Sequence, residues 1–374
     1  MSICYVNPTF LVRRPVAELI GRLGKNHKVG LFVPKKLFRK FESKWHSDIG
    51  KAKVYAYSAV NIPFINFEWP IPITPMFFIN LFRVFWSYDI VHMWTYFYLN
   101  SIFTLIYKIF ARKTRLIMSC DTFPGYSFNP GFLTKVLFKV YTVLLGWFLF
   151  SVPNKIHLYG ESMAKFALKA GVKQKKIAVV PTGINIEKFS KAKAIDMKSL
   201  GLEKNDFVVM YAGLVVPRKG IDVMLKVVKK LKQKNIKLLL VGEGPSKNKF
   251  EKMAEAMGIG KNVVFAGWRK DIPQIMKSAD VLILPSRGEG LPGIVMEAMA
   301  SGLPVVASDI PCIPDLIQDN VSGFLCPMDD VGCFAKKVVE AKKLSDRIKK
   351  NASNKIKNFR WEKLIGKYKE MYSK

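Results

Sequence analysis

The stretch that most constrains this chain is residues 280–309, DVLILPSRGEGLPGIVMEAMASGLPVVASD. Its opening apolar run predicts a short strand, and the two glycines of residues 286–291 predict a tight turn after it. Pro292 suits the first position of a helix, Gly302 suits its end, and a second apolar run follows. A helix that begins behind a glycine turn offers free N–H groups and a positive dipole end, so these residues predict an anion site.

Two carboxylates flank this expected anion site. Glu289 lies in the turn, and Glu297 lies five residues beyond Pro292, roughly 7.5 Å along the helix axis. Because like charges repel, the turn carboxylate suits neutral hydroxyl donors better than a phosphate. Phosphate at the helix tip with hydroxyls on both sides is the outline of a nucleotide-sugar. A solvated acidic turn before an amphipathic helix is the alternative, but the flanking glycines, proline and strands favour the ligand site.

The spacing of Glu289 and Glu297 resembles the E-x7-E pattern of glycosyltransferase family 4, the glycosyl transferases group 1. The segment SRGEGLPGIVMEAMASGLPVVAS resembles that family at nearly every position. The resemblance implies a retaining, hexosyltransferase-type enzyme, in which Glu289 holds sugar hydroxyls and orients the donor and Glu297 holds the ribose. We expect the turn and helix tip at Gly290, Leu291 and Pro292 to bind the donor diphosphate.

Strand-type apolar runs alternate with helical stretches through the whole chain. The expected strands are residues 3–7, 28–33, 53–57, 90–93, 115–119, 155–158, 177–180, 207–212, 236–241, 262–265, 280–285, 304–308 and 323–326. This alternation predicts α/β domains with parallel sheets covered on both faces. With the resemblance, it implies the GT-B fold, two Rossmann-like doubly wound domains facing across a cleft. We expect an acceptor-side domain at 1–188, a nucleotide-sugar-binding domain at 189–352, and a final helix at 353–374 returning to the first domain.

The segment YAGLVVPRKG at residues 211–220 resembles the family's phosphate loop. Gly213 and Lys219 match the family pattern, and Lys219 stands where the family has its phosphate lysine. Leu214 occupies the position of the family's arginine. Arg218 could replace that arginine in part, although a neighbouring loop residue points in a different direction and the forked guanidinium is geometrically demanding.

Two further loops are expected to line the donor site. In VGEGP, Gly244 lets the backbone approach a ligand closely, although a plain turn explains the same residues. In FAGWRKD, Trp268 and Arg269 stand where relatives contact the nucleotide base. These two side chains could stack on the base or only cover the edge of the cleft.

The acceptor side departs from the family pattern. In SCDTFPG, Cys120 stands where the family often has a histidine, and Asp121 follows as the candidate catalytic residue on this side. A turn or capping role is the alternative for Asp121. Arg13 and Arg14 follow the first strand as either an anion contact or a solvated helix start. In SYDIVHMW, His92 resembles the histidine that ends a strand in the family, and we expect it to be a packed strand-end residue, with a catalytic role as the alternative.

Charge and composition limit the partners. The chain has 374 residues and a formal net charge of +32, and residues 1–185 contain 25 Lys and Arg against 7 Asp and Glu. The positive electrostatic field of such a chain favours anionic partners such as phosphorylated small molecules, anionic lipid or nucleic acid. No RNA- or DNA-binding motif is recognised, so we expect a nucleotide-sugar and no nucleic acid.

The cysteines and histidines give expectations about metals and redox compartment. The five cysteines are scattered without a CxxC pair, which argues against disulfides and zinc and for a reducing cytosol. With four histidines and no Asp-x-Asp cluster, we expect no metal and no cofactor besides the donor substrate.

Three segments bear on membrane contact. Residues 35–45, KKLFRKFESKW, predict an interfacial helix on anionic lipid, and residues 72–86 suit either lipid or the core. Residues 132–152 are interrupted by Lys135 and Lys139, so we expect no transmembrane span. These lysines form one narrow polar stripe with Thr142 and Gly146, so we expect a helix buried between the sheet and neighbouring helices, with lipid contact as the alternative. The N-terminus lacks a signal-peptide pattern. We therefore expect a cytoplasmic protein, peripheral on the inner face of the cell membrane, with a lipid or lipid-linked acceptor. The alternatives are a soluble acceptor, or a weak or inactive relative acting as a binding protein.

Overall fold

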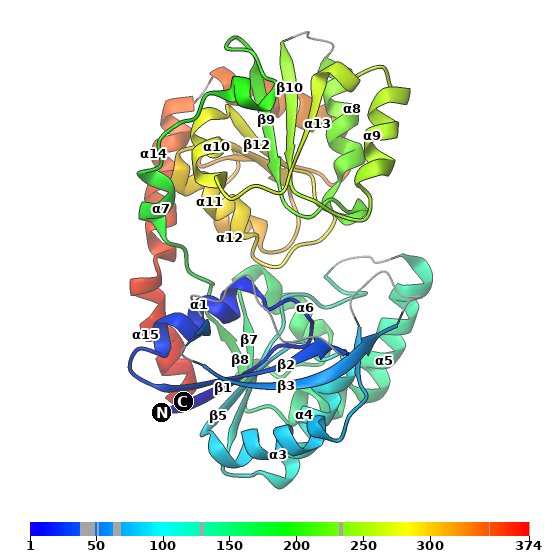
Figure 1. The fold of residues 1–374 in the computed structure, drawn as a ribbon, viewed down its shortest axis with the longest axis vertical. Helices are drawn as coiled ribbons and strands as arrows, with labels where there is room; N and C mark the ends of the chain where they lie inside the picture. The colour runs from blue at the N-terminus through cyan, green and yellow to red at the C-terminus, as the bar shows by residue number, and fades with distance from the viewer. Residues whose placement is uncertain are drawn as a thin grey trace.

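The computed structural model describes residues 1–37, 49–50, 52–62, 69–127, 131–231, 235–343 and 345–373. They form two α/β domains, one above the other in Figure 1. The N-terminal domain has an eight-stranded sheet in the order β4-β3-β2-β1-β5-β6-β7-β8. Its strands are β1 Ser2–Val6, β2 Lys28–Lys36, β3 Lys53–Asn61, β4 Pro70–Pro72, β5 Ile90–Trp94, β6 Arg115–Ser119, β7 Lys155–Leu158 and β8 Ile177–Val179. Within the described residues, all pairings in this sheet are parallel except that of β3 with β4.

Helices cover both faces of the N-terminal sheet. On one face, α3 (Met76–Ser87), α4 (Leu99–Phe110), α5 (Phe132–Ser151) and α6 (Ala164–Lys169) pack into one apolar core. On the other face, α1 (Arg14–Leu23) packs with the C-terminal helix α15 (Trp361–Ser373). Burying both faces explains why these strands are apolar along their whole length.

The C-terminal domain has a six-stranded parallel sheet in the order β11-β10-β9-β12-β13-β14. Its strands are β9 Phe207–Ala212, β10 Ile236–Val241, β11 Val263–Gly267, β12 Val281–Leu284, β13 Val305–Ser308 and β14 Phe324–Cys326. Its helices are α8 Ile221–Leu231, α9 Lys247–Ala256, α10 Ile272–Ser278, α11 Gly293–Ser301, α12 Ile313–Leu316, α13 Val331–Lys343 and α14 Ser345–Ile356. One apolar core joins this sheet to the helices on both of its faces.

The chain passes between the domains twice, and the two crossings pair with each other. The first crossing leads into α7 (Ile186–Ser190), whose Phe189 lies in the C-terminal core. The second leaves α14 and enters α15. Ile184 on the first crossing donates its N–H to the Phe359 carbonyl at 2.9 Å and forms an isolated bridge with Arg360. This pairing ties the two connections into a single hinge region.

The predicted architecture of two doubly wound sheets is confirmed, with each predicted strand present and its ends shifted by at most a few residues. Pro292 was expected in the first helical position, but it is the N-cap residue of α11, with ψ at 109°. The helix therefore starts one residue later, at Gly293. Gly302 ends it in the left-handed conformation, with φ at 77°, as expected of a helix stop.

Two expectations are wrong. Cys326 and Cys333 form a disulfide, with Cα atoms 5.7 Å apart, because the first turn of α13 folds back beside the end of β14. The cysteine pattern therefore gives no evidence for a reducing compartment. Helix α5 is also largely exposed rather than buried, with only 17% of its apolar window inside the protein. The predicted interfacial helix at 35–45 lies mostly outside the described residues.

Candidate active site

The candidate active site lies where the carboxyl ends of the two sheets face each other. From the N-terminal domain come the loops after β1 and β6, and from the C-terminal domain come the loops after β9 to β12. A Cβ atom at Gly290 would lie 3.1 Å from the Cβ atom of Asp121, so the two domains touch here. A cavity of about 240 Å³ between them is lined by residues of both domains, including Trp94, Tyr159 and Leu291. Ligands of parallel sheets bind at this edge.

A buried ion pair occupies the glycine-rich turn. Lys219 follows β9 at the end of a short 3-10 helix, and its Nζ atom lies 2.6 Å from Glu289 Oε1. Burial alone would raise the pKa of the Glu289 carboxyl, but Lys219 and Arg218 outweigh it and hold that pKa below its ordinary value. Glu289 is therefore charged at neutral pH. The structure thus brings the expected phosphate lysine and the turn glutamate together.

Arg218 lies in the same short 3-10 helix as Lys219 but makes a longer contact with the Glu289 carboxylate. Its Nη1 atom is 3.8 Å from Glu289 Oε2 and donates a hydrogen bond to the carbonyl of Gly288. Leu214, at the family's arginine position, is 55% exposed and its carbonyl accepts a hydrogen bond from the Tyr211 hydroxyl. Arg218 therefore supplies the second positive charge in this half of the site.

Close backbone approaches fix the loops after β9, β10 and β11. The Val215 N–H donates to the Glu243 carbonyl at 3.0 Å, and the Gly213 N–H donates to Val241 at 2.9 Å. A Cβ atom at Gly244 would lie 2.3 Å from the Val215 carbonyl oxygen, so only glycine fits there. The loops that carry Gly213 and Gly244 therefore lie side by side at the edge of the cleft.

Trp268 and Arg269 follow β11 on the same rim. The Trp268 side chain is 59% exposed, with Lys270 5.8 Å from its ring. Arg269 forms two hydrogen bonds with Asp271, at 2.9 and 2.6 Å. The Trp268 ring is thus accessible to a ligand, whereas the Arg269 guanidinium is already paired with Asp271.

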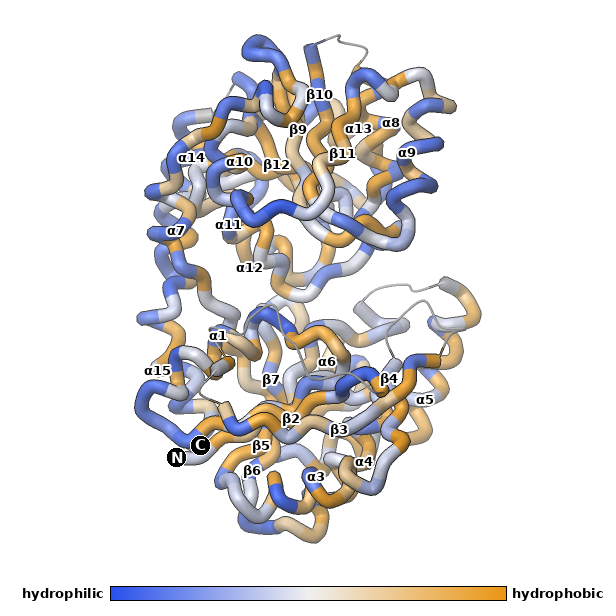
Figure 2. Tube along the Cα trace, viewed as in Figure 1, coloured by the Kyte–Doolittle hydropathy of each residue, from blue (hydrophilic) through white to orange (hydrophobic). Residues whose placement is uncertain are grey.

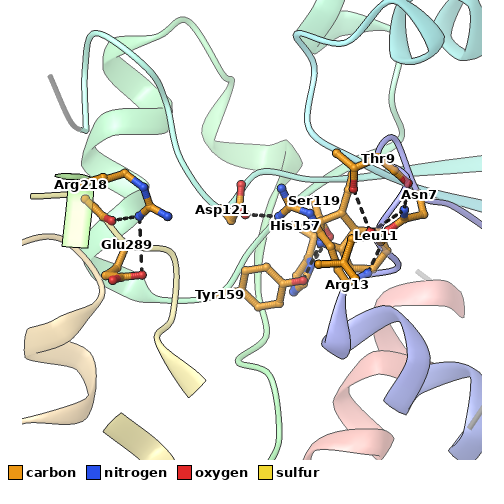
Figure 3. Close-up of polar contacts among 12 residues, drawn as sticks. Asn7, Thr9, Leu11, Arg13, Ser119, Asp121, His157, Tyr159, Arg218 and Glu289 are labelled. Carbon is orange, nitrogen blue, oxygen red and sulfur yellow. Dashed lines mark hydrogen bonds and ion pairs between the residues drawn. The ribbon is translucent and has the colours of Figure 1, made fainter. Parts of the chain in front are cut away.

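Both arginines that follow β1 contact carboxylates of the candidate site. Arg14 reaches from the N-terminal domain to Glu297 on α11, and its Nε atom also donates to Glu18 at 2.8 Å. Arg13 forms an ion pair with Asp121, on the acceptor side (Figure 3). The loop that carries them is shaped by buried Asn7, whose Oδ1 accepts from the Arg13 N–H at 3.1 Å. The sequence allows either an anion contact or a solvated helix start for these arginines, and the structure shows both side chains paired with carboxylates.

Cys120 and His92 belong to the packed core. The Cys120 thiol is fully buried, and burial raises its pKa, so it does not reach the cleft. His92 is buried between the Tyr372 hydroxyl and the Ser119 hydroxyl, each 2.8 Å away. This confirms the expectation that His92 is a packed residue. Ser119 also contacts His157 at 2.6 Å, so the hydrogen-bonded chain joins β5, β6, β7 and α15.

Arg287 is a positioning residue that the sequence did not reveal. It lies in the turn before α11 and contacts Asp222 at 2.6 Å and Asp329 at 2.8 Å. These contacts tie the turn to α8 and to the loop after β14. Its partners are 65 and 42 residues away in the sequence, so no local pattern signals the role. No cluster of His, Cys, Asp and Glu suited to a metal lies in the described parts of the chain.

Two α/β domains whose sheets face each other across the site form the architecture of the GT-B glycosyltransferases. The chain matches the family model described as glycosyl transferases group 1 over residues 192–358. It matches the model of glycosyltransferase family 4 over residues 12–188. The chain belongs to this family and is a glycosyltransferase.

Similar proteins agree with this assignment. An Escherichia coli UDP-Gal:alpha-D-GlcNAc-diphosphoundecaprenol alpha-1,3-galactosyltransferase is 30% identical over 76% of this chain and 75% of its own length. An uncharacterised glycosyltransferase of Methanocaldococcus jannaschii is 27% identical over 94% of this chain and 91% of its own. Anabaena HepE, solved with UDP and glucose, superimposes with a TM-score of 0.78 at 18% identity, covering 100% of this chain and 99% of that one. These likenesses establish the GT-B fold.

Proposed function

We propose that this glycosyltransferase moves a sugar from a UDP- or GDP-linked donor, with retention of anomeric configuration, to a lipid or lipid-linked acceptor at the cytosolic membrane face. The observation that carries the proposal is the Lys219–Glu289 pair in the turn before α11, facing Asp121 of the other domain. A cation, a carboxylate and a helix N-terminus then surround one point. These are the groups that a departing diphosphate and a sugar ring require.

The donor diphosphate would lie against the first turn of α11 and Lys219. An incoming phosphate would replace Glu289 as the partner of the Lys219 ammonium. Glu289 would then be free to accept hydrogen bonds from sugar hydroxyls, which favour its charged form as the contact with Lys219 does in the free protein. As the bond from sugar to phosphate breaks, Lys219 and Arg218 would stabilise the growing negative charge of the leaving group.

The remaining residues would orient the two substrates. Glu297 would hold the ribose, and Arg14 would keep its carboxylate in place from the other domain. Trp268 would cover the base. Asp121, positioned by Arg13, would contact the acceptor hydroxyl. The acceptor class is supported by the E. coli relative, whose name gives a sugar diphosphoundecaprenol as its acceptor.

A labelled-sugar assay tests the proposal. Purified protein and native membranes are incubated with labelled UDP- and GDP-sugars, and label entering the organic-soluble fraction is counted. We expect transfer from one donor by the native protein and none by Glu289→Gln, which keeps the side-chain shape. Label only in the aqueous fraction would indicate a soluble acceptor, and full activity of the variant would refute the assigned site.

A further inference from the structure

An extensive apolar surface lies on one side of the N-terminal domain. The buried residues of α3, α4 and α5 belong to the same core, so these helices cover the same face of the sheet. Their outward side chains therefore point to the same side of the molecule, and Figure 2 shows the three helices as largely hydrophobic. We define the apolar helix face by its exposed members Trp86, Phe110, Leu133, Leu137, Leu144 and Trp147. Monomeric proteins rarely expose large apolar areas without a partner for them, so this concentration of exposed apolar side chains on one face calls for a partner.

Helix α5 forms most of this face and is fixed to the domain along one stripe. Thr142, Gly146 and Phe150 are among its buried residues, and a Cβ atom at Gly146 would lie 3.6 Å from the Ala170 carbonyl oxygen. The small residues Thr142 and Gly146 therefore lie on the inward side of the helix, whereas Trp147 is 74% exposed. Among the described helices, α5 has the length and composition to cross a membrane. In this fold, however, it lies along the surface of the domain.

The charges around the apolar helix face select its partner. Residues 70–151 contain seven Lys and Arg but only two acidic residues, Asp89 and Asp121. Asp89 accepts hydrogen bonds from Ser2, and Asp121 is paired with Arg13. A second copy of this chain would bring the same positive charge to the contact. An anionic bilayer complements both the apolar area and the charge, and tryptophans are favoured at bilayer interfaces.

The apolar helix face adjoins the acceptor side of the active site. The loop that carries Asp121 continues to Gly125, where a Cβ atom would lie 3.0 Å from the Lys135 carbonyl oxygen and 3.1 Å from the Lys139 side chain. Lys139 also lies 5.7 Å from the ring of Tyr126. The N-terminal half of α5 therefore packs directly on the acceptor-side loop.

We propose that the N-terminal domain docks on an anionic lipid bilayer through the apolar helix face, with α5 lying in the interfacial layer. The docked protein would present the Asp121 loop at the bilayer surface, where a lipid-linked acceptor is located. This link to the acceptor rests on the proposed function, whereas the docking itself does not. The surface differs from the segment at 35–45 that the sequence favoured.

Vesicle flotation with the full chain tests the docking without donor or acceptor. We expect the protein to float with phosphatidylglycerol-containing vesicles, and Leu137→Glu/Leu144→Glu/Trp147→Glu to lower partitioning about tenfold or more. A matched control, Lys363→Gln/Lys367→Gln/Lys369→Gln, removes the same net charge from exposed positions on α15 at the opposite face. We expect this control to retain most of the binding.

Three results would overturn the docking surface. The native protein could fail to float, the glutamate variant could float as well as the native protein, or light scattering could reveal a dimer that the variant dissociates. Transfer to a detergent-dissolved acceptor separates this proposal from the proposed function, because the variant should keep that activity. Flotation without any transfer would support the surface and refute the proposed function, and transfer without flotation would do the reverse.

Discussion

Replacing Lys219 by Met tests the central ion pair of the site. In the native protein, the Lys219 ammonium lies 2.6 Å from the buried Glu289 carboxylate, and Arg218 is 3.8 Å away. Removing one partner of a buried ion pair costs about 3–5 kcal/mol when the other charge is left alone. Because Arg218 remains, we expect the free energy of unfolding to fall by about 3 kcal/mol at pH 7.

The same variant has a defined pH dependence. Lys219 is the largest cause that lowers the pKa of Glu289 in the native protein, so in the variant we expect burial to dominate and that pKa to be raised. A raised pKa in the folded state means that protonation stabilises the variant as the pH falls. The deficit relative to the native protein should therefore shrink below about pH 5. The double variant with Glu289→Gln should recover most of the lost stability.

Urea unfolding followed by tryptophan fluorescence at pH 7 and pH 4.5 measures these effects, and calorimetry with UDP and GDP measures donor binding. Losing one charge-assisted phosphate contact should weaken nucleotide binding roughly 10- to 100-fold in both Lys219 variants. If Lys219→Met were as stable as the native protein at both pH values, the stabilising role of the Lys219–Glu289 ion pair would be refuted. Unchanged binding of both nucleotides would refute the phosphate role of Lys219 and leave the ion pair standing.

Three further perturbations follow from the structure. Gly220→Ala should destabilise by about 3 kcal/mol or more, because its Cβ atom would lie 2.0 Å from a backbone oxygen at a φ of +69°. Gly258→Ala has the same φ strain with open space around it and should cost only about 1 kcal/mol in urea unfolding; equal costs would contradict the close approach. Arg14→Gln should lower the free energy of unfolding by about 2 kcal/mol by leaving Glu297 without its cation, and a neutral effect in the same assay would show that the pair is not formed in solution. Burial lowers the pKa of His157 to about 4. The free energy of unfolding should therefore fall by up to about 3 kcal/mol as the pH falls from 6.5 to 4. His157→Gln should flatten that part of the pH profile of stability measured by chemical denaturation.

Local pattern was enough to predict the strands and the site loops on the donor side. Strand and helix periodicity, the glycine turn and the paired glutamates are properties of neighbouring residues, and the strand positions and GT-B class are confirmed. The wrong expectation about α5 came from polarity alone. Thr142 and Gly146 were interpreted as part of a polar stripe of a buried helix, but they are the small residues through which α5 packs inward.

The sequence by itself determined the alternating strands and helices, the glycine-rich turn before α11, and the family, because each depends on residues close together in the chain. Only the tertiary structure decided which charges meet across the domains: Arg13 with Asp121 and Arg14 with Glu297 are 108 and 283 residues apart. It also decided which side of α5 faces solvent. A helix that is apolar on all sides has no polar stripe to mark its exposed face, so the buried side depends on which elements pack against it.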